Sequence, residues 1–303
     1  MSPVSLLYMD CLALLSVTLF HMKGTLMGGI VWLASYPKSG NTWMRAFLQN
    51  LILNRSGSVP VNELSQFGYA DGYKRWYQQA ADGPLDSLSS EQVAQLTPKV
   101  QHFMAHSRPQ SVFVKTHNSL SRRWGVPLIT EDVTAGAIYI IRNPLDVVIS
   151  LADHFGSSID EAVDFMNNPY AAAEEDEHKL EQIYGSWSDH VNSWQNFNAR
   201  YVARVRYEDL QENPAAAFAG VATFLGTRPP RKILDRAIEN SSFEVLQKQE
   251  EKDGFLEKSE KSQQFFRSGK SGDWKNNLSS KQVQRIVDVH HDKMQEFGYL
   301  EGL

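Results

Sequence analysis

The residues best suited to chemistry gather in one short turn, which reads Tyr-Pro-Lys-Ser-Gly-Asn-Thr-Trp over residues 36–43. An apolar run precedes the turn and an amphipathic run follows it. Backbone N–H groups at a helix start near Gly40 would face an anion, and Lys38 and Thr42 would add an ammonium and a hydroxyl. The turn therefore predicts an anion-binding site. It differs from a Walker A loop, because Pro37 stands where GxxxxGK[ST] requires glycine.

An alternation of apolar runs and helical patterns is expected to position this turn. Continuous apolar runs predict buried parallel strands at residues 29–34, 111–117, 136–144 and 203–210. Helical spacing of apolar residues predicts the main helices at residues 40–53, 144–155, 180–197, 214–225 and 280–296. Weaker helical patterns lie within 54–110, most clearly at 90–105, and the acidic stretch 156–180 predicts a surface lobe or lid. The alternation predicts one doubly wound α/β domain with a central, mostly parallel sheet flanked by helices.

Composition excludes several classes of protein. The chain has 303 residues, a formal net charge of -5 and a pI near 6.0, which argue against a general binder of nucleic acid or anionic membranes. A local basic cleft is compatible with that balance. The single cysteine, Cys11, excludes an internal disulfide framework and fits a reducing, cytoplasmic location. No CxxC or HExxH spacing occurs, so we expect no metal site.

Residues 1–27 differ from the rest of the chain. Their apolar run, 11–20, is about half as long as a segment that spans a bilayer, and no lysine or arginine precedes it. A signal anchor is one interpretation. We favour a disordered or loosely packed extension that begins at an upstream start codon, since Met22 or Met27 could each open the domain. The domain would then be 28–303, with no stable membrane insertion.

The turn at 36–43 closely resembles the YPKSGTTW loop of cytosolic-type sulfotransferases, which use 3′-phosphoadenosine 5′-phosphosulfate (PAPS) and release the desulfonated nucleotide (PAP). Asn41 replaces the first threonine, a change associated with bacterial members such as the glycopeptide-antibiotic sulfotransferases. The resemblance implies a single P-loop-like domain of the sulfotransferase fold. It also implies that the loop binds the phosphosulfate and that Trp43 offers adenine an aromatic face. The implied nucleotide-binding residues of the loop are Lys38, Ser39, Gly40, Asn41, Thr42 and Trp43.

Four later segments resemble the same family in the same order. Residues 140–150 are similar to its RNPKDVAVS element, which implies that Arg142 and Ser150 hold the 3′-phosphate. The guanidinium of Arg142 is suited to that task, because its planar fork of donors matches a phosphate. Residues 265–275 are similar to FxRKGxxGDWK, within a nucleotide-closing loop at 250–272.

This closing loop is expected to grip the 3′-phosphate through Arg267, Ser268 and Gly269. Ser268 stands where the family has lysine, so one positive charge is missing. Two other segments concern the base. Ser241-Ser242-Phe243 is similar to the TSF that contacts adenine, which implies contacts from Ser241 and Phe243, and Tyr207 in RYEDL is similar to the tyrosine beside the base. The resemblance covers roughly residues 32–276.

The chemistry implied is sulfuryl transfer to a hydroxyl or amine by in-line displacement, without a metal. His117, in the VKTH at the end of the second strand, is the expected general base, because an imidazole titrates near neutral pH. Lys38 would neutralise charge on the bridging oxygen of the leaving nucleotide. Lys115 lies on the same strand face as His117 and would supply a second cation to the sulfuryl oxygens. His154 could also reach the cleft.

The acceptor is expected to be a small molecule that contacts the variable segments 54–110 and 156–183. Their aromatic residues predict an aromatic or lipid-like acceptor: Phe67, Tyr69, Tyr73, Trp76, Tyr77 and Phe165. A cationic acceptor, selected by the acidic run 174–177, is the alternative. The family's KxxxTVxxxE dimer motif would begin at Lys275, but Ser279, Ser280 and Gln284 replace its Thr, Val and Glu. Any homodimer should therefore use a different interface.

Two other functions fit parts of the pattern. A P-loop kinase would explain a lysine beside a helix start, but the absent GK[ST] argues against it. A binding protein that keeps the nucleotide pocket without turnover would explain the same residues. It would bind PAPS or PAP and transfer nothing.

Overall fold

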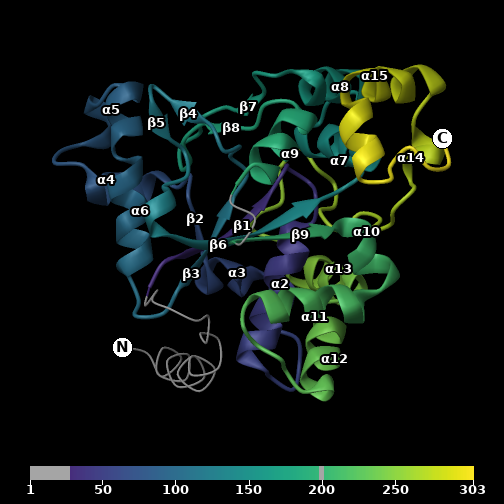
Figure 1. Ribbon diagram of the computed structural model, residues 1–303, viewed down its shortest axis with the longest axis horizontal. Helices are drawn as coiled ribbons and strands as arrows, with labels where there is room; N and C mark the ends of the chain where they lie inside the picture. The colour runs from purple at the N-terminus through teal and green to yellow at the C-terminus, as the bar shows by residue number, and fades with distance from the viewer. Residues whose placement is uncertain (1–27, 198–200) are drawn as a thin grey trace.

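A five-stranded sheet lies at the centre of the computed structural model, which describes residues 28–197 and 201–303. The sheet order is β2-β3-β1-β6-β9, and every neighbouring pair is parallel (Figure 1). Its strands are β1 (Ile30–Ser35), β2 (Tyr69–Ala70), β3 (Val112–Thr116), β6 (Thr134–Ile141) and β9 (Val202–Arg206). The sequence predicts all of these except β2, which is too short to show a pattern. The predicted extension 1–27 lies outside the described residues.

The middle strand, β1, is buried on both faces of the sheet. It pairs with β3 on one side and with β6 on the other, and all its residues are buried. Its side chains alternate between two cores: Trp32 packs on one face of the sheet, and Val31 and Leu33 pack on the other. Because all the strands are parallel, their carboxyl ends meet at one edge, where α/β proteins bind ligands.

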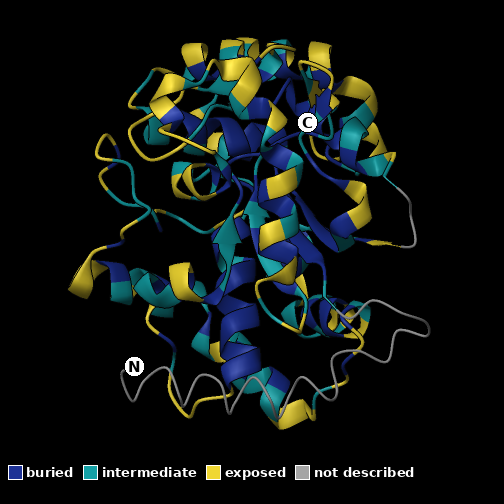
Figure 2. Ribbon diagram, turned by 90° about the vertical axis from the view of Figure 1, so that its left-hand side faces the viewer, coloured by how far each residue is buried: buried dark blue, intermediate teal, exposed yellow. Residues whose placement is uncertain are grey.

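Helices cover both faces of this sheet. One face packs against α2 (Asn41–Leu53), α10 (Tyr207–Glu212), α11 (Pro214–Phe224) and α12 (Arg231–Asn240). The other packs against α6 (Thr97–His106), α7 (Pro144–Phe155), α8 (Ile159–Asn167), α9 (Trp187–Gln195) and α15 (Ser280–Glu296). Buried residues accordingly concentrate in the strands and in the helix surfaces turned toward them (Figure 2). The predicted α/β class with a parallel sheet flanked by helices is confirmed.

Several predicted boundaries were wrong for local reasons. The helix predicted at 180–197 begins only at Trp187, because β8 (Gln182–Ile183) pairs antiparallel with β7 (Ala172–Ala173). The stretch 156–180, in which no pattern is evident, contains α8. A reciprocal capping bond between Ser158 and Glu161 starts that helix. The helical pattern at 90–105 divides into α5 (Ser90–Gln95) and α6.

The remaining elements lie mainly in the connections. They are η1 (Val61–Glu63), α3 (Leu64–Phe67), α4 (Lys74–Ala80), η2 (Leu85–Ser87), β4 (Arg122–Arg123), β5 (Val126–Pro127), η3 (Glu131–Val133), α13 (Phe243–Asp253) and α14 (Trp274–Asn277). The strand predicted at 203–210 ends at Arg206, and α10 begins directly after it. Within the described residues, no helix combines the length and the apolar character needed to cross a membrane.

The residues after α15 are joined to the sheet by one buried carboxylate. The hydroxyl of Tyr299 donates to Oε2 of Glu208, at 2.9 Å, and the backbone N–H of Asn143 donates to Oε1, at 3.0 Å. Glu208 lies in α10, directly after β9, and Asn143 follows β6. The end of the chain is therefore coupled to the loop that carries Arg142.

Candidate active site

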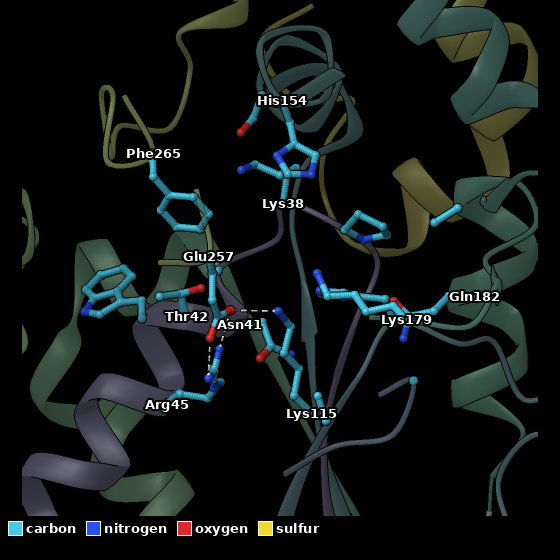
Figure 3. A pocket seen from close by; sticks show the side chains of 18 of the residues that line it. Lys38, Asn41, Thr42, Arg45, Lys115, His154, Lys179, Gln182, Glu257 and Phe265 are labelled. Atoms are coloured by element: carbon cyan, nitrogen blue, oxygen red, sulfur yellow. Dashed lines mark hydrogen bonds and ion pairs between the residues drawn. The ribbon is translucent and has the colours of Figure 1, made fainter. Parts of the chain in front are cut away.

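A cavity of about 460 Å³ opens at the carboxyl edge of the sheet (Figure 3). Its walls come from the β1–α2 turn, the end of β3, the β6–α7 connection, α13 and the segment after α13. The predicted site residues that line it are Lys38, Gly40, Asn41, Thr42, Trp43, Lys115, His117, Arg142, Ser150, Tyr207, Phe243, Arg267, Ser268 and Gly269. Residues from six separate parts of the chain thus meet in one cavity.

Ser39 and Ser241 are predicted nucleotide contacts that the structure does not bring to the cavity wall. Both are fully buried. The hydroxyl of Ser241 donates back to the carbonyl of Ala237, at 2.8 Å, so it closes the end of its own helix α12. This arrangement does not support a contact between Ser241 and adenine.

The β1–α2 turn has the backbone geometry expected of an anion site. Gly40 precedes the first residue of α2 with φ 101°, and no side chain in the described part of the chain caps that helix start. The N–H groups there are therefore available to a ligand. A Cβ at Gly40 would lie 2.6 Å from Cδ2 of Tyr207, so only glycine fits. The side chain of Asn41 instead donates to the carbonyl of Leu33, at 2.8 Å, and fixes the turn to β1.

Lys38 places its ammonium inside the cavity. Its backbone has φ 65°, in the left-handed region, and Nζ lies 4.1 Å from the centroid of the Phe265 ring. Burial lowers the pKa of Lys38 from 10.5 to about 8, although the nearby Asp153 opposes this shift. Lys38 has no ion-pair partner among the described residues, and its backbone is strained. These two features are typical of a cation kept for a ligand.

His117 follows β3 and has its tautomer fixed. Nδ1 lies 2.8 Å from the carbonyl oxygen of Ser35, which can only accept, so Nδ1 carries the proton and Nε2 keeps its lone pair. Burial, reinforced by Lys115, lowers the pKa of His117 well below its ordinary value of 6.5. Behind it, His190 lies 3.0 Å from the His117 carbonyl and 2.8 Å from the hydroxyl of Tyr139. A neutral, oriented imidazole at the cavity wall can accept a proton.

Lys115 is paired with a residue that the sequence does not single out. Its Nζ lies 3.0 Å from Oε2 of Glu257, and Arg45 binds the same carboxylate through two N–H···O contacts. Burial lowers the pKa of Lys115, whereas Glu257 acts to raise it. Burial opposes ionisation of Glu257, but Lys115 and Arg45 together hold its pKa far below the usual value. All three residues line the cavity.

Arg142 joins the first turn to the closing loop. Nη1 donates to the carbonyl of Lys38, at 3.0 Å, and Nη2 donates to that of Lys270, at 3.5 Å. Its guanidinium also lies 4.3 Å from the centroid of the Tyr207 ring. The hydroxyl of Tyr207 donates to the carbonyl of Gly269, at 3.4 Å. Arg142 and the loop that carries Arg267 are therefore neighbours.

Two buried carboxylates bind the backbone of the closing loop at two places, and neither is evident as functional from sequence. Asp146, 2% exposed, accepts from the backbone N–H groups of Gly272, at 2.8 Å, and Trp274, at 3.0 Å. Glu250 accepts from those of Phe265 and Phe266, at 2.7 and 2.8 Å. Both carboxylates lie on helices that face the glycine-rich loop. The sequence could have identified them only if the path of that loop had been known.

The opposite end of the cavity is of mixed character. Of the predicted aromatic residues, Tyr69 and Tyr73 line it, whereas Phe67, Trp76, Tyr77 and Phe165 do not. Tyr184 and Phe155 add aromatic surface, and the charged side chains there are Arg75, Glu174, Asp176 and Lys179.

His154 also lines this cavity, as the sequence suggests. Burial and the nearby Lys38 lower its pKa to about 3, so its imidazole is neutral. Its Nδ1 is buried without a hydrogen-bond partner in the described structure. Among the described residues, no group of three or more His, Cys, Asp or Glu side chains is arranged to hold a metal.

The fold and this cavity define an α/β protein whose cavity, with a helix start and several cations, suits an anionic ligand. The family described as "Sulfotransferase domain" matches residues 30–298, and the chain belongs to that family. Sulfotransferase 1B1 of dog is 28% identical over 280 residues, which are 86% of this chain and 82% of the relative. Sulfotransferase 2A1 of Macaca fascicularis is 27% identical over 278 residues, which cover 87% of this chain and 84% of the relative.

Solved structures share the fold. Mouse sulfotransferase SULT7A1 complexed with PAP has a TM-score of 0.59 and 19% identity, over 94% of this chain and 88% of that one. Retinol dehydratase in complex with androsterone and the inactive cofactor PAP has a TM-score of 0.61 and 18% identity, over 94% and 85%. The sequence-based identification of the family and the fold is confirmed, and the chain is a sulfotransferase.

Proposed function

We propose that this sulfotransferase moves the sulfuryl group of PAPS to a hydroxyl, or an amine, of a small-molecule acceptor. The observation that carries the proposal is that His117, Lys38 and Arg142 share one cavity although they come from three different strand ends. The PAP in the structures of SULT7A1 and retinol dehydratase supports PAPS as the donor.

In this mechanism the acceptor oxygen forms a bond to sulfur as the bond between sulfur and the bridging phosphate oxygen breaks. The acceptor proton goes to Nε2 of His117, whose Nδ1 proton is held by Ser35. Lys38 neutralises the charge that develops on the bridging oxygen, and PAP leaves. Lys115 contacts the sulfuryl oxygens. No step of this transfer uses a metal.

The donor's nucleotide end would lie between the helix start of α2 and the closing loop. Arg142, Ser150 and Arg267 would contact the 3′-phosphate, and Gly269 would bring the loop backbone close to it. A Cβ at Gly269 would lie 2.2 Å from Cδ2 of Phe243, so this close packing requires glycine. The rings of Trp43 and Tyr207 contact each other edge to face, with centroids 5.5 Å apart, and would together form one wall beside adenine.

For the acceptor we propose an aromatic or lipid-like alcohol. Tyr69, Tyr73, Phe155 and Tyr184 give the acceptor end its apolar surface. The complex of retinol dehydratase with androsterone shows that this fold accommodates such a molecule in that protein. A cationic acceptor is the alternative, because the carboxylate of Glu174 also lines this wall and would attract a positive charge. A cytoplasmic location, a bacterial type of enzyme and a homodimer with a different interface remain predictions from the sequence.

The test is a transfer assay with labelled PAPS against phenols, sterols, long-chain alcohols and amines, followed by an extract of small metabolites. We expect a sulfated product, identified by mass, and none from Lys38→Met. PAP binding without any labelled product would indicate a protein that binds the nucleotide without turnover. Tighter, Mg²⁺-dependent binding of ATP than of PAPS would indicate kinase chemistry instead.

A further inference from the structure

A carboxylate inside a cavity suited to an anionic donor needs an explanation. Glu257 lies between Arg45 of α2 and Lys115 of β3, and all three line the cavity (Figure 3). Arg45 Nη2 is 2.7 Å from Oε1, Arg45 Nη1 is 2.9 Å from Oε2, and Lys115 Nζ is 3.0 Å from the same Oε2. One carboxylate therefore holds two cations from different elements.

Arg45 by itself supplies a hydrogen-bond donor to each carboxylate oxygen of Glu257. Its side chain is 6% exposed and binds both carboxylate oxygens, an arrangement that is strong and geometrically specific. The contact between Glu257 and Lys115 is additional to these two bonds. It holds the lysine side chain in one conformation, although a free lysine side chain has many rotamers. With one N–H of the ammonium on Glu257, two others remain for the cavity.

We propose that Glu257 is a positioning residue, which fixes the ammonium of Lys115 at the cavity wall where the sulfuryl oxygens must lie. The inference rests on the proposed sulfuryl transfer, because it gives Lys115 its role there. Glu257 itself touches neither donor nor acceptor. It acts through Lys115, with Arg45 as its anchor.

The same contact couples Lys115 to the closing loop. Glu257 belongs to the segment that also places Phe265 against Lys38 and brings Arg267 to the cavity. That segment has separate attachments, since Glu250 and Asp146 bind its backbone at two other places. Removing the charge of Glu257 should therefore disturb Lys115 and leave the loop attached.

The experiment compares Glu257→Gln with Glu260→Gln, a matched change at an exposed glutamate of the same segment. PAP affinity is measured by calorimetry, and kcat is measured at saturating PAPS with the acceptor found in the transfer assay. We expect Glu257→Gln to lower kcat by about tenfold to a hundredfold, the effect of a small misplacement at a reacting centre. Its Kd for PAP should stay within about threefold of the wild type or decrease, because a negative charge leaves an anion site.

A double-mutant cycle shows whether Glu257 acts through Lys115. In a Lys115→Met background, Glu257→Gln should lower kcat no further, because the group it positions is gone. Glu257→Asp keeps a charge beside Arg45 but shortens the reach to Lys115, so it should also lower kcat. It serves as the second variant if the glutamine variant does not fold.

Three results would overturn the inference. They are a normal kcat in Glu257→Gln or Glu257→Asp, an equal loss of kcat with and without Lys115, and a loss of PAP affinity with unchanged kcat. The last would make Glu257 a tether of the loop only. A wild-type protein that transfers no sulfuryl group would refute the proposed function, and the inference with it, whereas active wild type with normal variants refutes the inference alone.

Discussion

Replacing Lys38 by methionine should make the protein without nucleotide more stable at neutral pH. The ammonium lies in the cavity with no ion-pair partner in residues 28–197 and 201–303, and burial lowers its pKa from 10.5 to about 8. Such a shift corresponds to about 3 kcal/mol, at about 1.4 kcal/mol for each pH unit. Losing the cation–π contact with Phe265 costs ~1 kcal/mol, so Lys38→Met should gain about 2 kcal/mol in the free energy of unfolding.

The gain should depend on pH with a definite sign. Below about pH 8, Lys38 is charged in both the folded and the unfolded chain, and the folded state carries the whole cost of burying the charge. Between about pH 8 and 10.5, the folded state loses its proton first, so the wild type gains stability relative to the variant. Above that range both states are neutral, and the advantage of Lys38→Met disappears.

Denaturant unfolding without nucleotide, at about pH 7 and about pH 10, measures this difference. Lys232→Met, at an exposed lysine of α12, is the control and should change stability little at either pH. PAP should stabilise the wild type much more than Lys38→Met. A variant less stable than the wild type at neutral pH, or an advantage that persists unchanged at high pH, would refute the reasoning.

The remaining predictions concern binding and turnover. His117→Ala should keep the Kd for PAP but lower kcat about 10²-fold, and in the wild type the acid limb of kcat/KM should lie below pH 6.5, because burial lowers the pKa of His117. Arg142→Ala should weaken PAP binding about tenfold or more in calorimetry, since it removes a charged donor from the cavity. Asp146→Ala should lower the free energy of unfolding by ~1–3 kcal/mol and raise the KM for PAPS, because the N–H groups of Gly272 and Trp274 lose their acceptor. Unchanged PAP binding in Arg142→Ala, or an unchanged KM in Asp146→Ala, would contradict these roles.

The sequence predicted the strands and the turn that form the site because their signals are local. The apolar runs before Lys38, His117 and Arg142 end where charged or small polar residues begin, and in a parallel sheet such ends must meet at one edge. The helix predicted at 180–197 failed because its early apolar residues, such as Ile183, instead pair with β7. The spacing of apolar residues alone does not distinguish a helix from a strand over so few residues.

The groups that sequence reasoning missed depend on long-range contacts. Glu257 lies 142 residues from Lys115 and 212 from Arg45, and nothing in its neighbouring sequence marks it among many charged residues. Asp146 is similar, because its partners lie in a loop 126 and 128 residues away. For Ser241 the sequence predicted a contact with the ligand, but a local one formed instead. A serine at a helix end can donate its hydroxyl to a carbonyl of its own helix.

The hydrogen bond from Tyr299 to Glu208 has a practical consequence for handling the protein. The other oxygen of Glu208 accepts from the backbone N–H of Asn143, beside Arg142. Ending the chain at α15 would remove Tyr299, so Glu208 and the loop beside Arg142 would be held less firmly. An affinity tag or fusion partner at this end should therefore follow Leu303 through a spacer. A shortened version, even one that expresses well, would be a poor reference for measuring nucleotide affinity.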